Sequence, residues 1–151
     1  MGGVRASDRA GVGGFGAGGG GGVAGFGTGG GGTGDPSTFA GGGGAGLGGA
    51  IFVDQSATLQ VATTTFLRNH ALGGDAPIGG GNATGGLGRG GALYARNAAS
   101  LTLLYATFAA NRVSTGRGQP TAPAGSGLFA DQSGATGAQI ELRNLLFDGD
   151  D

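Results

Sequence analysis

The feature that most constrains the fold of this chain is a repeat. Its first copy spans residues 48–69 and its second spans 90–111, so that Ala50 and Ala92 lie 42 residues apart, as do Phe66 and Phe108. A less complete third copy spans 126–150. Because a single unit of this kind cannot bury its apolar face alone, such units stack on one another.

Each copy predicts short β-strands. Residues 50–53 and 59–61 alternate with a period of two, are rich in β-branched side chains and are bounded by glycine or polar turns. No helix of ordinary length is expected. We therefore predict an all-β fold, a parallel β-helix or solenoid of about three rungs.

Alignment of the copies predicts ladders of like side chains inside the stack, spaced by about 4.8 Å. The four aligned sets are Ile51, Leu93 and Leu128; Leu59, Leu101 and Ile140; Val61, Leu103 and Leu142; and Phe66, Phe108 and Phe147. Asn69 and Asn111 are the last residues of the first two copies, and we predict that they also form a structural ladder. Extra residues around 134–137 interrupt the third copy.

A stripe of aromatic side chains is expected on the outer face. Phe52, Tyr94 and Phe129 each follow an inward ladder residue, so the pleat of the strand turns them outward. Such a stripe is a possible binding surface for sugar rings or a partner protein. The interpretation that we favour is that glycine-rich segments cover it.

The turn after each first strand is expected to fix the register. Asp54, Arg96 and Asp131 align there with alternating charge. Next to them, a ladder of amides is predicted from three further aligned residues, Gln55, Asn97 and Gln132.

Glycine-rich sequence separates the repeats and precedes them; the chain has 42 glycines in 151 residues. Residues 1–47 are predicted to be either a flexible low-complexity segment or extended polyproline-II-like strands that lie against the repeat domain, 48–151. The insertions 70–89 and 112–125 are expected to be long loops on one face, where binding usually resides.

Charge and composition exclude several classes of protein. The net charge is −1, and the basic residues are all arginines spread along the chain, so we expect no nucleic-acid binding. The absence of cysteine excludes disulfides and thiolate zinc sites. No apolar run is long enough to span a bilayer, and residues 1–8 lack a signal-peptide core. Either the protein stays inside the cell or the chain is a piece of a longer one.

No residue set predicts catalysis, a cofactor or a metal. His70 is the only histidine and is interpreted as a residue at a loop edge. For calcium, the single Gly73-Gly74-Asp75 and the terminal acidic group of Asp148, Asp150 and Asp151 are weak candidates, and a solvated tail explains the latter better. We therefore expect a protein that is not an enzyme.

The repeat resembles a known family. With Gly48-Gly49-Ala50-Ile51 and Phe66 followed by Asn69, then Gly90-Gly91-Ala92-Leu93 and Phe108 followed by Asn111, it is similar to the GGAI and FxxN repeats of polymorphic outer-membrane proteins and of autotransporter passengers. In the third copy Ser126-Gly127-Leu128 replaces the glycine pair, and Asp150 stands where Asn is expected.

This resemblance implies a right-handed parallel β-helix that is exported, with structural or adhesive roles and no catalytic residues to carry over. The family's signal sequence and outer-membrane barrel are not in the chain, which suggests a fragment.

We thus expect a structural and adhesive module of a bacterial surface or secreted protein, with glycans or host and neighbour-cell proteins as partners. Both ends of the stack are expected to lack caps, so that further copies could associate there. A polysaccharide lyase or hydrolase fragment is the main alternative. An ice-binding solenoid is less favoured because the threonines at 63–65 do not recur regularly.

Overall fold

The computed structural model describes residues 42–76, 84–97, 100–133 and 139–149. In these ranges the chain is all-β and has no helix, so that part of the prediction is confirmed. The described residues accordingly contain no helix that could cross a membrane. The contacts divide the chain into two units. Of the described residues, the repeat unit comprises 47–71, 89–97, 100–113, 124–133 and 139–149, and the glycine unit comprises 42–46, 72–76, 84–88 and 114–123.

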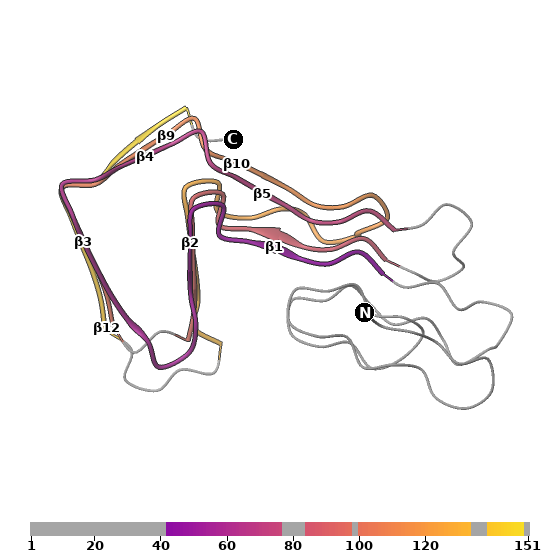
Figure 1. Ribbon diagram of the computed structural model, residues 1–151, viewed down its shortest axis with the longest axis horizontal. Coiled ribbons are helices and arrows are strands. Elements are labelled where there is room, and N and C mark those ends of the chain that lie inside the picture. The colour runs from indigo at the N-terminus through magenta and orange to yellow at the C-terminus, as the bar shows by residue number, and fades with distance from the viewer. Residues whose placement is uncertain (1–41, 77–83, 98–99, 134–138, 150–151) are drawn as a thin grey trace, which may run out of the picture. The chain divides into compact units, whose positions relative to one another are not determined.

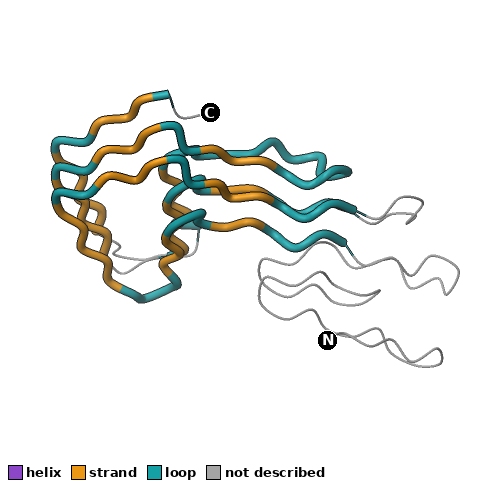
Figure 2. Tube along the Cα trace, turned by 45° about the horizontal axis from the view of Figure 1, so that its top comes forward, coloured by secondary structure: helices purple, strands orange, loops and turns teal. Residues whose placement is uncertain are grey.

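Three parallel three-stranded sheets build the repeat unit, and each copy contributes one strand to each sheet (Figures 1 and 2). The middle copy supplies the central strand every time. The first sheet contains β2 (Ile51–Val53), β7 (Leu93–Arg96) and β11 (Leu128–Asp131). The second contains β3 (Thr58–Ala62), β8 (Ser100–Leu104) and β12 (Gln139–Arg143). The third contains β4 (Thr65–Leu67), β9 (Thr107–Ala109) and β13 (Leu146–Asp148).

The register of these sheets is the one that alignment of the repeats gives. In the first sheet Leu93 pairs with both Ile51 and Leu128. In the third sheet Phe108 pairs with both Phe66 and Phe147. In the second sheet Leu101 and Leu103 likewise pair with the aligned residues of the first and third copies. Figure 1 shows β2, β3 and β4 along three sides of one triangular outline, so the three sheets face a shared interior.

Burial is concentrated in the middle copy. Phe108 has an exposed fraction of 0%, and Leu93, Leu101 and Leu103 are equally buried. The third-copy ladder residues do not share this burial: Phe147 is 51% exposed, and Ile140 and Leu142 are exposed as well. The expectation that all members of the ladders are buried is therefore wrong for Ile140, Leu142 and Phe147. Their strands have a neighbour on one side only, although the first copy, which is also outermost, keeps Phe66 at 5% exposed.

The corners of the repeat unit use left-handed backbone conformations at matched positions. One corner has positive φ at Gly48, Gly90 and Gly125. The third copy thus keeps a glycine, Gly125, at the residue that needs the left-handed conformation. The replacement of the glycine pair by Ser126-Gly127 begins one residue later and leaves this corner unchanged. Two other corners place residues with side chains in this region: Thr63, Tyr105 and Asn144 at one, and Arg68 and Ala110, followed by Gly149, at the other.

The glycine unit packs backbone against backbone. The Gly74 N–H donates to the Gly44 carbonyl at 2.7 Å, the Gly86 N–H to the Gly74 carbonyl at 2.8 Å, and the Gly116 N–H to the Gly86 carbonyl at 2.9 Å. A Cβ added at Gly86 would overlap the carbonyl oxygen of Gly44. Only glycine allows so close an approach of chains.

The described parts of the two insertions are loops that hydrogen-bond to one another, with short strands at both ends of 70–89 and at the start of 112–125. Two small sheets pair β1 (Gly46–Leu47) with β6 (Gly88–Arg89) and β5 (His70–Leu72) with β10 (Arg112–Ser114). The predictions for residues 1–41 and for the extra residues at 134–137 lie outside the described residues.

Candidate functional surfaces

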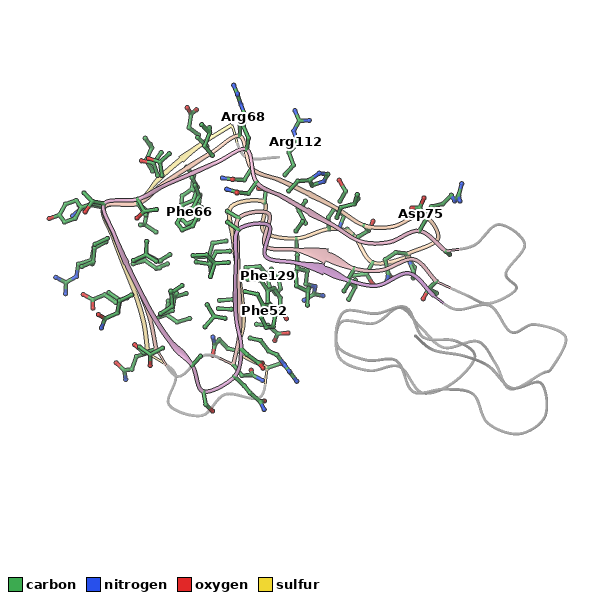
Figure 3. All side chains as sticks on the ribbon, viewed as in Figure 1. Phe52, Phe66, Arg68, Asp75, Arg112 and Phe129 are labelled. Carbon is green, nitrogen blue, oxygen red and sulfur yellow. The ribbon has the colours of Figure 1, made fainter. Side chains whose placement is uncertain are left out.

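The outward aromatic side chains form a continuous column. The Phe52 and Tyr94 rings stack at 5.5 Å with an interplanar angle of 7°, and the Tyr94 and Phe129 rings at 5.7 Å and 3°. In Figure 3, Phe52 and Phe129 lie on the opposite side of the β2 sheet from Phe66, which points into the interior. The pleat therefore separates an outer column from the inner column of Phe66, Phe108 and Phe147.

The faces of the middle and last rings of this column are occupied within the repeat unit. Tyr94 is only 2% exposed, because both of its ring faces are stacked. The guanidinium of Arg89 lies 4.7 Å from the centroid of the Phe129 ring, a cation–π distance. A sugar ring needs a free aromatic face, so Tyr94 and Phe129 are poor candidates for a glycan platform in this conformation.

A hydrogen bond anchors the column to the turn beside it. The Tyr94 hydroxyl donates to Oδ2 of Asp131 at 3.2 Å, and the Ser133 N–H donates to Oδ1 of the same carboxylate at 3.1 Å. Burial, together with the Asp131 charge, raises the pKa of Tyr94 to about 12. Hydrogen bonds from Ser133 hold the pKa of Asp131 below its ordinary value, with smaller contributions from the Tyr94 hydroxyl and the charge of Arg89.

The predicted register devices at the turn are formed in part. Nη1 of Arg96 lies 3.3 Å from Oδ1 of Asp54, an ion pair between copies. The amide ladder is not complete, because both amide atoms of Gln132 are buried without a hydrogen-bond partner. The backbone maintains the stacking here, since the Asn97 N–H donates to the Asp131 carbonyl at 2.7 Å.

Asn69 and Asn111 form the asparagine ladder that their spacing implies. Oδ1 of Asn111 accepts both the Asn69 N–H, at 3.0 Å, and the Asn69 Nδ2 donor, at 2.9 Å. Nδ2 of Asn111 donates to the Phe66 carbonyl at 3.0 Å. Asn111 is fully buried, so its amide satisfies backbone groups that would otherwise be unpaired at the corner.

An open depression lies on the sheet of β3, β8 and β12. Its volume is about 460 Å³, and it is lined by Gln60, Val61, Ala62, Thr102, Leu104 and Glu141. The register places Gln60, Thr102 and Glu141 side by side on successive strands. Glu141 also pairs with Arg143 at 2.6 Å. Sequence reasoning missed this surface, although the aligned copies contain the signal: a polar residue between two inward ladder positions in each copy.

The other candidate residues are not brought together. His70 lies exposed on β5, and Asp148 lies exposed on β13. Asp75 is also exposed; its Oδ1 accepts the Arg117 N–H at 2.7 Å, and Figure 3 labels it in the glycine unit. Within the described ranges, no three acidic or histidine side chains gather as metal ligands would. Asp150 and Asp151 lie outside those ranges.

Similarity to other proteins gives no guide to these surfaces. Comparisons with protein-family models, curated proteins and solved structures find no match.

Proposed function

We propose that this chain is a structural and adhesive module of a bacterial cell-surface or secreted protein, built as a right-handed parallel β-helix. The observation that carries the proposal is the register of the three sheets, in which every strand of the middle copy lies between its counterparts in the other two. The resemblance of the repeats to the GGAI and FxxN motifs of polymorphic outer-membrane proteins and autotransporter passengers supports the proposal of a surface protein.

A structural role follows from how the repeat unit is stabilised. The largest buried apolar side chains of the middle copy pack against apolar side chains at the equivalent positions of the adjacent copies. Each copy therefore stabilises its neighbours, and the stack can be lengthened by adding copies without a new kind of core. A scaffold that holds surfaces at fixed spacing needs this property.

The depression over β3, β8 and β12 is the surface that we assign to adhesion. Its amide, hydroxyl and carboxylate groups can hydrogen-bond sugar hydroxyls, and Ala62 and Leu104 offer apolar contact to a sugar ring. The polar residues recur strand by strand, which suits an extended polysaccharide. Glu141 is the one carboxylate among the lining residues, whereas glycoside hydrolysis usually requires a pair. Binding without cleavage is the better fit.

Binding of polysaccharides to the immobilised chain tests the proposal. We expect the wild-type chain to retain one or more members of a panel of neutral and acidic polysaccharides. The double variant Gln60→Ala with Glu141→Ala should weaken that binding by about tenfold or more, which corresponds to about 1.4 kcal/mol. Its thermal melt should remain close to that of the wild type, because Gln60 is exposed and Glu141 is half-buried.

A matched control is Tyr105→Ser, which changes an exposed side chain that is not among the lining residues. It should bind as the wild type does. Equal binding by the double variant, or failure of the wild-type chain to bind any polysaccharide, would overturn the adhesive assignment.

A further inference from the structure

Two arginines lie at the corner of the repeat unit that the asparagine ladder holds. Arg68 directly precedes Asn69, and Arg112 directly follows Asn111. Both arginine side chains are exposed, and in Figure 3 both point away from the interior that Phe66 enters. The two arginines are far apart in the sequence, so they share this corner only because the first and middle copies are stacked.

Hydrogen bonds between the two copies fix the backbone at this corner. The Arg68 N–H donates to the Ala109 carbonyl at 3.0 Å, and the Arg112 N–H donates to the Asn69 carbonyl at 2.8 Å. Oδ1 of Asn111 accepts the Asn69 N–H at 3.0 Å. The spacing of the two arginine backbones is therefore set by the fold, and a ligand that contacts both arginines meets a preorganised platform.

Within the described part of the repeat unit, these are the two arginines that have no partner for their charge. Arg96 and Arg143 form ion pairs with carboxylates of the same unit, and the guanidinium of Arg89 lies over an aromatic ring. Neither Arg68 nor Arg112 takes part in a contact of this kind. Their guanidinium groups are therefore available to a ligand without the loss of an existing interaction.

The surroundings of the two arginines make this corner basic. His70 and Arg112 are the first residues of β5 and β10, which pair with each other, and both side chains are exposed. In the strands of the third sheet the one acidic residue is Asp148, on β13, the strand farthest from β4 and Arg68. The corner is thus locally basic, although the net charge of the chain is −1.

We propose that Arg68 and Arg112 form a second binding site, which takes the sulfate or carboxylate groups of an acidic polysaccharide. A planar guanidinium has paired N–H donors that match the oxygens of such anionic groups. The choice of a polysaccharide as the carrier of these groups rests on the adhesive function proposed above. Two arginines suit a chain that needs few anionic contacts, whereas nucleic-acid binding relies on neutralising many phosphates.

Binding to immobilised dextran, dextran sulfate and carboxymethyl dextran at one ionic strength tests this site. The wild-type chain should bind at least one of the charged forms more tightly than neutral dextran. Arg68→Gln and Arg112→Gln should each lower that affinity by about threefold, and the double variant by about tenfold, because each exposed charge pair contributes modestly. The thermal melts should stay close to that of the wild type, since both side chains are exposed.

Arg117→Gln is the matched control, because Arg117 is an exposed arginine of the glycine unit and its loss changes the net charge equally. This variant should bind the charged dextrans as the wild type does. Equal weakening by Arg117→Gln would mean that net charge, and not this corner, decides binding. That result, or equal binding of charged and neutral dextran by the wild-type chain, would overturn the proposal.

Two further comparisons separate this site from the depression and from nucleic-acid binding. The double variant Gln60→Ala with Glu141→Ala should keep the preference for charged dextran, and loss of that preference would place the anion at the depression instead. The Arg68 and Arg112 double variant should keep any binding of neutral polysaccharides, so failure of this site is distinct from failure of the adhesive function. Tighter binding of single-stranded polydeoxythymidine than of dextran sulfate, with the same loss in the arginine double variant, would overturn the assignment to a polysaccharide.

Discussion

Ala110 adopts a backbone conformation that its side chain disfavours. Its φ is 51°, and the third copy has Gly149, with φ 58°, at the equivalent corner. For residues with a Cβ, the left-handed region costs roughly 1–2 kcal/mol, whereas glycine enters it without steric penalty. Sequence alone does not reveal this corner, because Arg68 and Ala110 carry none of the glycine or asparagine signals that usually mark such positions.

Replacement of Ala110 by glycine should therefore stabilise the fold. We expect the free energy of unfolding to rise by about 0.5–1 kcal/mol, after the extra flexibility of glycine in the unfolded chain is subtracted. Urea unfolding monitored by circular dichroism measures the change. The control is Ala109→Gly, one residue earlier in β9, which should lower stability. If both substitutions destabilise equally, the strain at Ala110 is not relieved by glycine.

Tyr94 should make stability depend on pH in the alkaline range. Its pKa in the fold is about 12, above the ordinary value of 10.0, because burial and Asp131 disfavour the phenolate. The contribution of neutral Tyr94 is thus complete below pH 10 and is lost as the pH rises from 10 towards 12. Unfolding free energies measured along this range should fall more steeply for the wild type than for Tyr94→Phe. Identical slopes would contradict the assigned pKa.

At the scale of the strand stack, position within the ladder decides how much a side chain contributes. Phe108 has neighbours on both sides, whereas Phe147 has one. We expect Phe108→Ala to lower the free energy of unfolding by about 3–5 kcal/mol, because it empties a closed site. Phe147→Ala, at a half-open site, should cost clearly less. Thermal melts of the two variants provide the comparison, and equal losses would mean that the middle copy is not specially buried.

The glycine segments should tolerate a methyl group only where the neighbouring chain leaves room. A Cβ at Gly86 overlaps the Gly44 carbonyl, whereas a Cβ at Gly74 would lie 3.1 Å from its nearest atom, the Gly44 nitrogen. Gly86→Ala should thus destabilise by about 1–3 kcal/mol or more, and Gly74→Ala by less. Hydrogen exchange at the amides of residues 84–88 would report the difference. Equal protection in both variants would argue against close packing of these chains.

The pairing of the strands could be predicted from the sequence, whereas the packing of the glycine segments could not, for one physical reason. Side chains such as Leu93 and Phe108 recur at a fixed spacing and reveal which strands are neighbours. Gly74, Gly86 and Gly116 are held by contacts of the backbone, which every residue possesses, and so leave no pattern to align. The insertions were therefore located from the sequence, but the backbone hydrogen bonds that join their described parts were not predicted.

The whole repeat unit depends on its third copy even though that copy is itself poorly buried. Removal of residues 124–151 would expose Leu93, Leu101, Leu103 and Phe108 on one side, and each such side chain contributes roughly 1.5–3 kcal/mol when buried. We expect the shortened chain to lose its cooperative thermal melt. A melt at the wild-type temperature would mean that the first two copies form an independent folding unit.

For the candidate surfaces, the sequence predicts which way a side chain points but not how deeply it is buried or which residues it lies beside. The outward direction of Phe52, Tyr94 and Phe129 followed from the pleat, but the burial of Tyr94 depends on its two stacked neighbours. The depression at Gln60, Thr102 and Glu141 combines residues from three distant parts of the chain and has meaning only once the strands are in register.

The 42-residue offset between Ile51 and Leu93 also has a mechanical consequence. In a stack of parallel strands one copy adds about 4.8 Å of height. The same 42 residues, drawn out to full extension, reach roughly 140–150 Å. Under tension along the stack, detachment of such a 42-residue copy would therefore release about thirty times the length that it occupied. A chain built in this way would yield in long, discrete steps and absorb work at each of them.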